Sequence, residues 1–119
     1  MSSRAEVARP VGRVAEVFGV LREREETTVI PFVCGGHPSV AGTGELIAGL
    51  AGAGAQIIEV GVPFSDPIAD GPVIAAAMHD VLTAGVRFGD IFDEVAKVRD
   101  RVDAALVAMV SVSIVHGCG

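Results

Sequence analysis

Apolar residues follow two alternating patterns along the chain, helical spacing and short continuous runs. Helical spacing over residues 11–25 and 40–52 predicts two amphipathic helices. Continuous β-branched and apolar runs over residues 27–33 and 56–60 predict two buried strands. The second strand begins about 29 residues after the first, which is the length of one βαβ unit. We therefore expect these two strands to be parallel.

The same alternation continues toward the end of the chain. Pro72 near the start and Gly85 after the end frame a predicted helix over residues 72–84. Residues 88–102 predict a further amphipathic helix, and residues 104–112 predict a third buried strand. This order is typical of a parallel sheet covered by helices. Both an open doubly wound sheet and a segment of a (β/α)8 barrel fit it, although a complete barrel needs about 250 residues.

Composition fits a single α/β domain over residues 1–119 and argues against several classes of protein. Half of the residues are hydrophobic, with 15 glycines and 6 prolines. The net charge of -6 comes without a basic stripe, which disfavours a nucleic-acid surface. No apolar run approaches the roughly 20 residues that span a bilayer, and the first residues lack the apolar segment of a signal peptide. We expect a cytoplasmic protein with neither a nucleic-acid nor a membrane partner.

Cysteine, histidine and glycine spacing gives little sign of a metal or nucleotide site. Cys34 and Cys118 are far apart and form no CxxC pair, so neither a disulfide framework nor a zinc knuckle is predicted. Cys34 and His37 are three residues apart, but no second pair of ligands accompanies them. The glycines within residues 42–49 depart from the GxGxxG spacing of dinucleotide-binding loops. We expect no bound metal ion.

Carboxylates gather directly after the second predicted strand, in residues 59–72, EVGVPFSDPIADGP. In both candidate architectures, the loops at the carboxyl ends of parallel strands carry functional groups. Strand alternation turns Glu59 toward an apolar interior, where burial would raise the pKa of its carboxyl group and let it both give and accept a proton. The structural alternative is a Glu59 that is exposed to water or paired with an arginine.

Prolines stiffen this acidic segment. Each proline fixes φ, which holds the carboxylates of Asp66 and Asp70 in position. Two structural alternatives remain open: Asp70 could cap the helix that follows, and Ser65 with Asp66 could form an ordinary turn.

Residues 59–72 resemble the signature of the tryptophan synthase alpha chain family, (β/α)8 barrels that cleave indole-3-glycerol phosphate. The resemblance extends upstream through residues 30–39, IPFVCGGHPS, and downstream through residues 84–86, AGV, and covers about residues 11–108. It implies that the chain is the N-terminal portion of such a barrel, apparently truncated, with about three strands.

By motif position, the resemblance also implies roles for individual residues. Glu59 corresponds to the family's proton-transferring glutamate, and Asp70 to the aspartate that stabilises charge on the indole nitrogen. Phe32 matches a position that lines the indole pocket, although a plain core role is the alternative. The implied reaction is a retro-aldol cleavage to indole and glyceraldehyde 3-phosphate, without a metal or organic cofactor. The implied contact loop for the family's beta chain contains Pro63, Ser65, Asp66 and Pro67.

The sequence departs from the family pattern in several places. His37 stands where the family has the aspartate of a Gly-Asp-Pro turn, and Ser111 and Ser113 stand where it has a pocket tyrosine and an asparagine. The family's late phosphate-binding loops have no counterpart in these residues. Since three strands would leave an open sheet edge, we expect the isolated chain to be part of an assembled whole or poorly active. The alternatives are an inactive fragment that retains only the beta-chain contact loop, and an unrelated phosphate-binding α/β domain.

Overall fold

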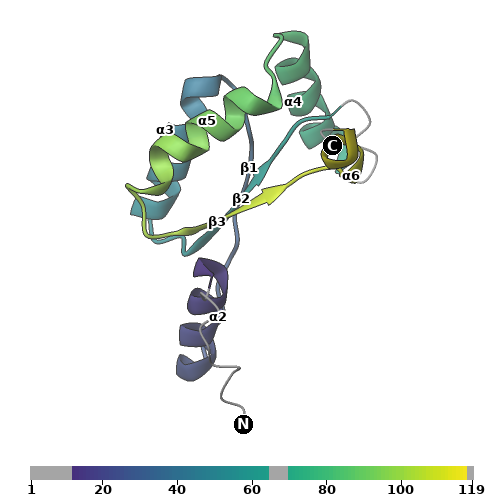
Figure 1. Cartoon of the computed structure of the whole chain (residues 1–119). Helices are drawn as coiled ribbons and strands as arrows, with labels where there is room; N and C mark the ends of the chain where they lie inside the picture. Colours follow the sequence, from purple (N-terminus) through teal and green to yellow (C-terminus); the bar gives the residue numbers. More distant parts are fainter. Residues whose placement is uncertain (1–11, 65–69, 118–119) are drawn as a thin grey trace.

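A computed structural model describes residues 12–64 and 70–117, which form a three-stranded parallel sheet with helices packed against it (Figure 1). The strand order in the sheet is β1-β2-β3. The elements, in chain order, are α2 (Arg13–Arg24), β1 (Phe32–Cys34), α3 (Val40–Gly52), β2 (Ile57–Gly61), α4 (Gly71–Thr83), α5 (Phe88–Arg99), β3 (Ala105–Met109) and α6 (Val112–Gly117). The predicted alternation of helices with parallel strands is therefore confirmed.

Local sequence signals explain where the helices begin. The Ser39 hydroxyl oxygen accepts a hydrogen bond from the Gly42 backbone N–H at 3.0 Å and so caps α3. Pro72 lies in the first turn of α4, where a missing N–H costs no helical hydrogen bond. At the start of α5, the Asp90 carboxylate accepts the Arg87 backbone N–H at 2.9 Å.

The hydrophobic core lies on one face of the sheet, beneath α3 and α5. Because side chains alternate along a strand, Ile58 and Val60 face this core, while Ile57, Glu59 and Gly61 face the opposite side. The buried core residues are Val33, Ile47, Ile58, Val60, Ile91, Val98 and Ala104. We call the side of the sheet that carries Glu59 the open face.

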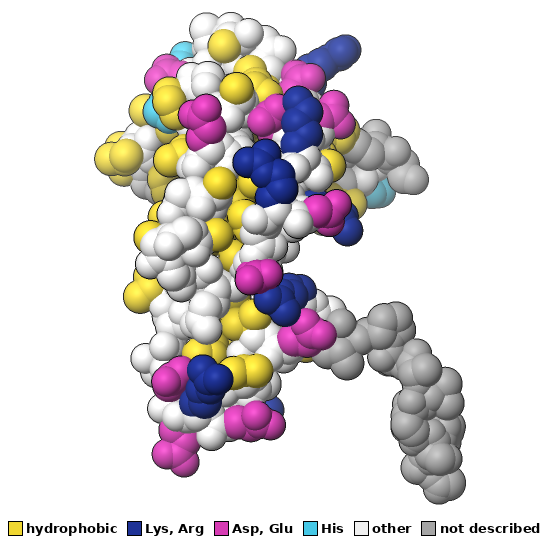
Figure 2. Space-filling view, turned by 90° about the vertical axis from the view of Figure 1, so that its left-hand side faces the viewer, with side chains coloured by type: hydrophobic (Ala, Val, Ile, Leu, Met, Phe, Trp, Pro, Cys, Tyr) yellow, Lys and Arg dark blue, Asp and Glu magenta, His cyan; other side chains and the backbone are white. Residues whose placement is uncertain are grey.

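Helix α2 lies apart from α3 and α5, below the sheet in Figure 1, and packs against β3. The Arg13 guanidinium donates two hydrogen bonds, of 2.9 and 2.6 Å, to the carbonyl oxygen of Asp103, which lies just before β3. Figure 2 shows one face of the molecule, which carries charged side chains of both signs with apolar side chains exposed between them.

The first strand is shorter than the sequence predicts. A buried strand was expected over residues 27–33, but β1 begins at Phe32, and Val29 is 80% exposed. Pro31 has no N–H to donate, and only its carbonyl oxygen joins the sheet, where it accepts the Glu59 N–H at 2.9 Å. High β-propensity alone did not give residues 27–30 a strand partner.

The end of the described chain also differs from the prediction. Strand β3 ends at Met109, whereas residues 104–112 were predicted as one strand, and the short helix α6 follows. A hydrogen bond of 3.0 Å from the Ile114 N–H to the Ser111 carbonyl oxygen turns the chain there. Helix α5 likewise ends at Arg99, before the predicted boundary at residue 102.

Candidate active site at the carboxyl end of the sheet

A row of three residues crosses the middle of the sheet. Phe32 on β1 is in register with Glu59 on β2, which is in register with Val107 on β3. Residues in register in a parallel sheet point to the same face, so all three belong to the open face. The predicted catalytic glutamate therefore has an aromatic residue on one side and an aliphatic residue on the other.

Glu59 is half-buried on this face. Among the residues that the structure describes, none forms a hydrogen bond or an ion pair with its carboxylate. The alternative of an arginine-paired Glu59 is therefore not seen within residues 12–64 and 70–117. A carboxylate without a protein partner is free to interact with a bound molecule.

The position of the Phe32 ring depends on Gly61. A Cβ atom added to Gly61 would lie 2.6 Å from Cε2 of Phe32, well inside contact distance. The ring therefore leans over the Gly61 backbone, toward the carboxyl end of β2. Phe32 is half-buried and lies on the face opposite the buried core cluster. Sequence reasoning did not single out Gly61, although a glycine inside a strand is a known sign of close approach.

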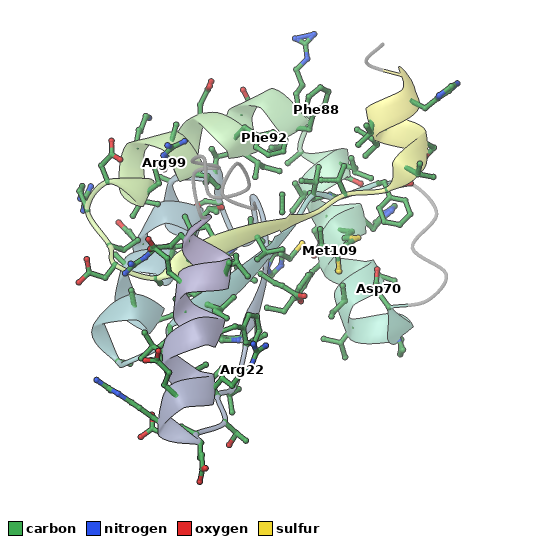
Figure 3. All side chains as sticks on the ribbon, turned by 60° about the horizontal axis from the view of Figure 1, so that its bottom comes forward. Arg22, Asp70, Phe88, Phe92, Arg99 and Met109 are labelled. Atoms are coloured by element: carbon green, nitrogen blue, oxygen red, sulfur yellow. The ribbon has the colours of Figure 1, made fainter. Side chains whose placement is uncertain are left out.

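Asp70 stands at the N-cap position of α4, and its side chain makes no capping hydrogen bond. Its negative charge acts instead on Cys34, at the carboxyl end of β1. Burial raises the pKa of the Cys34 thiol, and the Asp70 carboxylate raises it further because a nearby anion disfavours the thiolate. Cys34 is in register with Gly61, two residues beyond Glu59 on β2, so the Asp70 charge acts at the carboxyl ends of β1 and β2. Figure 3 shows Asp70 at the start of α4 and Met109 at the end of β3.

The connection from β1 to α3 is fixed by a buried threonine. The Gly36 N–H donates a hydrogen bond of 2.7 Å to Oγ1 of Thr43, whose side chain is fully buried. Gly36 has a φ of 87°, in the left-handed region that favours glycine. The hydrogen bond to Thr43 thus fixes the turn at Gly36-His37-Pro38, which has a histidine at its centre. Nε2 of this histidine lies 3.9 Å from a carboxylate oxygen of Asp80 on α4.

The predicted partner-contact loop is described only at its beginning. Ser65, Asp66 and Pro67 lie outside the described residues, whereas Pro63 is buried. Pro63 and Phe64 line a hollow of about 590 Å³ that also borders α5 and α6.

Ser111 and Ser113, which replace the tyrosine and asparagine expected from the family pattern, line this same hollow. Their hydroxyl oxygens lie 2.8 Å apart and share a hydrogen bond. The hollow therefore carries two small polar groups at the carboxyl end of the sheet.

Within the described ranges, no three histidine, cysteine or acidic side chains come close enough to hold a metal ion. The described helices include none that is long and apolar enough to cross a membrane.

Comparison with known proteins identifies the family. The family model of the tryptophan synthase alpha chain matches residues 18–119. The alpha chain from a Synechocystis strain is 45% identical over 94 residues, which is 79% of this chain and 36% of that protein. The alpha chain from Halorhodospira halophila is 41% identical over 110 residues, covering 92% of this chain and 40% of its own length. The chain thus spans well under half of these relatives.

Solved structures agree with the sequence comparison. The tryptophan synthase alpha subunit from Legionella pneumophila superposes with a TM-score of 0.87 at 27% identity, covering 92% of this chain and 42% of that one. A tryptophan synthase structure from M. tuberculosis matches with a TM-score of 0.82 at 33% identity. The fold is accordingly the N-terminal portion of a (β/α)8 barrel, as the sequence predicted, and the chain belongs to the tryptophan synthase alpha chain family.

Proposed function

We propose that the chain supplies the acid–base carboxylates for retro-aldol cleavage of indole-3-glycerol phosphate to indole and glyceraldehyde 3-phosphate. The observation that carries this proposal is the row of Phe32, Glu59 and Val107 on the open face, where Glu59 is half-buried beside an aromatic ring. Membership of the alpha chain family supports it. Residues 1–119 would form one partial barrel domain, acting in the cytoplasm.

In this reaction, Glu59 would move two protons. The hydroxyl on the carbon attached to the indole ring loses its proton, while C3 of indole gains one and the bond between these two carbons breaks. One carboxyl group that both gives and accepts a proton serves both transfers. The Asp70 carboxylate would stabilise the positive charge on the indole nitrogen, and Phe32 would form one wall of the indole pocket.

The remaining binding energy would come from parts of the fold that the described residues do not include. The substrate's phosphate needs donors such as a helix N-terminus and glycine-rich loops, which lie late in barrels of this type. The family's beta chain would contact the loop after β2. Because Pro63 is buried, it would hold that loop in place, while Ser65, Asp66 and Pro67 would make the contact.

The test is a chimera in which this chain replaces the corresponding part of the Synechocystis alpha chain. We expect it to release indole from indole-3-glycerol phosphate, and Glu59→Gln to lower the turnover by about 10²- to 10⁴-fold, because an amide cannot transfer the protons. The matched control is Glu45→Gln, an exposed glutamate on α3, which should leave turnover unchanged. Unchanged turnover in the Glu59→Gln chimera contradicts the proposal.

The open face also favours a second candidate, an inactive fragment that keeps only the beta-chain contact. In that case, the unsubstituted chimera would form no indole but would still bind the beta chain.

A further inference from the structure

The turn between β1 and α3 joins the carboxyl end of β2 to two helices. The Gly35 N–H donates a hydrogen bond of 2.8 Å to the Gly61 carbonyl oxygen at the end of β2. A Cβ atom added to Gly35 would lie 2.7 Å from Cγ2 of Ile91 on α5. A Cβ atom added to Gly36 would lie 2.8 Å from Cγ1 of Val81 on α4. Both helices therefore pack directly on the backbone of this turn, which only glycine allows.

The buried hydroxyl group of Thr43 holds the turn in this shape. Thr43 lies near the start of α3, and its side chain is fully buried. Its Oγ1 accepts the Gly36 N–H at 2.7 Å and donates to the Ser39 carbonyl oxygen at 3.4 Å. Gly36 is itself buried, so without this hydroxyl its N–H would lose a partner that water does not easily replace. Loss of the hydroxyl should therefore change the shape of the turn.

Helix α4 connects this turn to Asp70. The buried residues of α4, Met78 and Val81, lie in its second half, so the helix is held mainly near its end. Asp70 stands at the N-cap, with about 16 Å of helix between it and Val81 at 1.5 Å per residue. Because the backbone hydrogen bonds make a helix stiff, the packing of its last turns determines where its first turn lies.

We propose that Thr43 is a positioning residue, which places the Asp70 carboxylate at the carboxyl end of the sheet through the turn at Gly36 and helix α4. Thr43 acts through these two elements and not by contact with the substrate. This role rests on the proposed function, in which Asp70 stabilises the charge on the indole nitrogen.

The test measures the alkylation of Cys34 by iodoacetamide as a function of pH, in the 119-residue chain with Cys118→Ser. Cys34 is sensitive to the position of Asp70, because that carboxylate raises the pKa of the thiol. Thr43→Val removes the hydroxyl group but keeps nearly the same shape. It should make alkylation at pH 8 a few-fold faster, in the same direction as Asp70→Asn. Thr43→Ser keeps the hydroxyl group and should leave the rate unchanged.

A second background separates movement of Asp70 from exposure of the thiol. If Thr43→Val acts by moving Asp70, it should not increase the rate further in a chain that carries Asp70→Asn. If it only exposed Cys34 to water, the full increase would appear in that background as well, which would contradict the proposal. Thr83→Val is the matched control, because Thr83 is exposed on α4 and its hydroxyl oxygen lies 3.4 Å from Nε2 of His79 on the same helix. It should leave the rate unchanged.

The chimera gives a separate measurement of catalysis. Thr43→Val should lower kcat several-fold with little change in KM, because Asp70 acts on charge that develops in the transition state. Thr43→Ser should retain the activity. If Glu59→Gln left the turnover of the chimera unchanged, the proposed function would be wrong, but the alkylation of Cys34 would still decide whether Thr43 places Asp70.

Val81→Ala loosens the same contact from the side of α4. It leaves space against Gly36 and should increase the alkylation rate as Thr43→Val does, so the proposal is tested even if Thr43→Val does not fold. Far-UV circular dichroism shows which variants are folded. An unchanged alkylation rate in folded Thr43→Val, or in Val81→Ala, would overturn the proposal.

Discussion

At the scale of single residues, the missing side chain of Gly61 determines where the Phe32 ring lies. A Cβ atom there would meet the ring at 2.6 Å, and Gly61 sits in a strand whose backbone is fixed by both neighbours. We expect Gly61→Ala to lower the free energy of unfolding by about 1–3 kcal/mol, as overpacking usually does, and to reduce indole release by the chimera. Chemical denaturation and the indole assay measure the two effects.

Gly49→Ala is the control for this substitution. Gly49 lies inside α3, and a Cβ atom there would meet nothing within 4 Å. Alanine should therefore stabilise the helix by up to about 1 kcal/mol. If Gly61→Ala and Gly49→Ala changed the free energy of unfolding equally, the contact with Phe32 would not be the cause of the change at Gly61.

The interaction between Cys34 and Asp70 gives a prediction that depends on pH. The Asp70 carboxylate raises the pKa of the Cys34 thiol, so Asp70→Asn should lower that pKa and increase the thiolate fraction at a given pH. Alkylation of Cys34 by iodoacetamide at pH 8 should then proceed a few-fold faster, in a Cys118→Ser background that leaves one thiol.

Burial, the larger cause of the raised pKa, stays in place in this variant, so the reactivity should remain below that of a free cysteine. Asp80→Asn, which changes an exposed aspartate on the same helix, is the control and should leave the rate unchanged. If Asp70→Asn left the alkylation rate of Cys34 unchanged, Asp70 would lie away from the end of β1.

At the scale of elements, the sequence predicted the helices more closely than the strands. The predicted helix over residues 40–52 coincides with α3, because the Ser39 cap and the apolar spacing are both local signals. Strand β1 was predicted too long, because whether residues 27–31 pair depends on their neighbours in space and not on their own propensity. Helix α6 was missed, because its turn at Ser111 follows apolar residues that read equally well as a strand.

The candidate site, too, has features with a local sequence signal and features without one. The proline and acid order after β2 pointed to Glu59 and Asp70, and strand alternation explains why Glu59 and Phe32 share a face. The contact between Phe32 and Gly61, and the effect of Asp70 on Cys34, join residues far apart in the chain. Such pairs depend on the register of β1 against β2, which no local pattern specifies.

At the scale of the whole molecule, the residues that the structure describes leave apolar side chains exposed on both sides of the sheet. Phe92 on α5 is 39% exposed and Met109 at the end of β3 is 38% exposed. Exposed apolar surface of this kind has a cost in stability.

Completing the barrel should remove that cost. We expect the isolated chain to bind a hydrophobic dye strongly and the chimera with the Synechocystis remainder to bind it weakly, because the added strands and helices would cover the exposed apolar residues. Covering ~200 Å² of apolar surface contributes about 5 kcal/mol, so the chimera should also unfold at a clearly higher denaturant concentration. The intact Synechocystis alpha chain gives the reference for a closed barrel. If the chimera bound the dye as strongly as the isolated chain, its added part would not be packed against β3 and α5, whatever its activity.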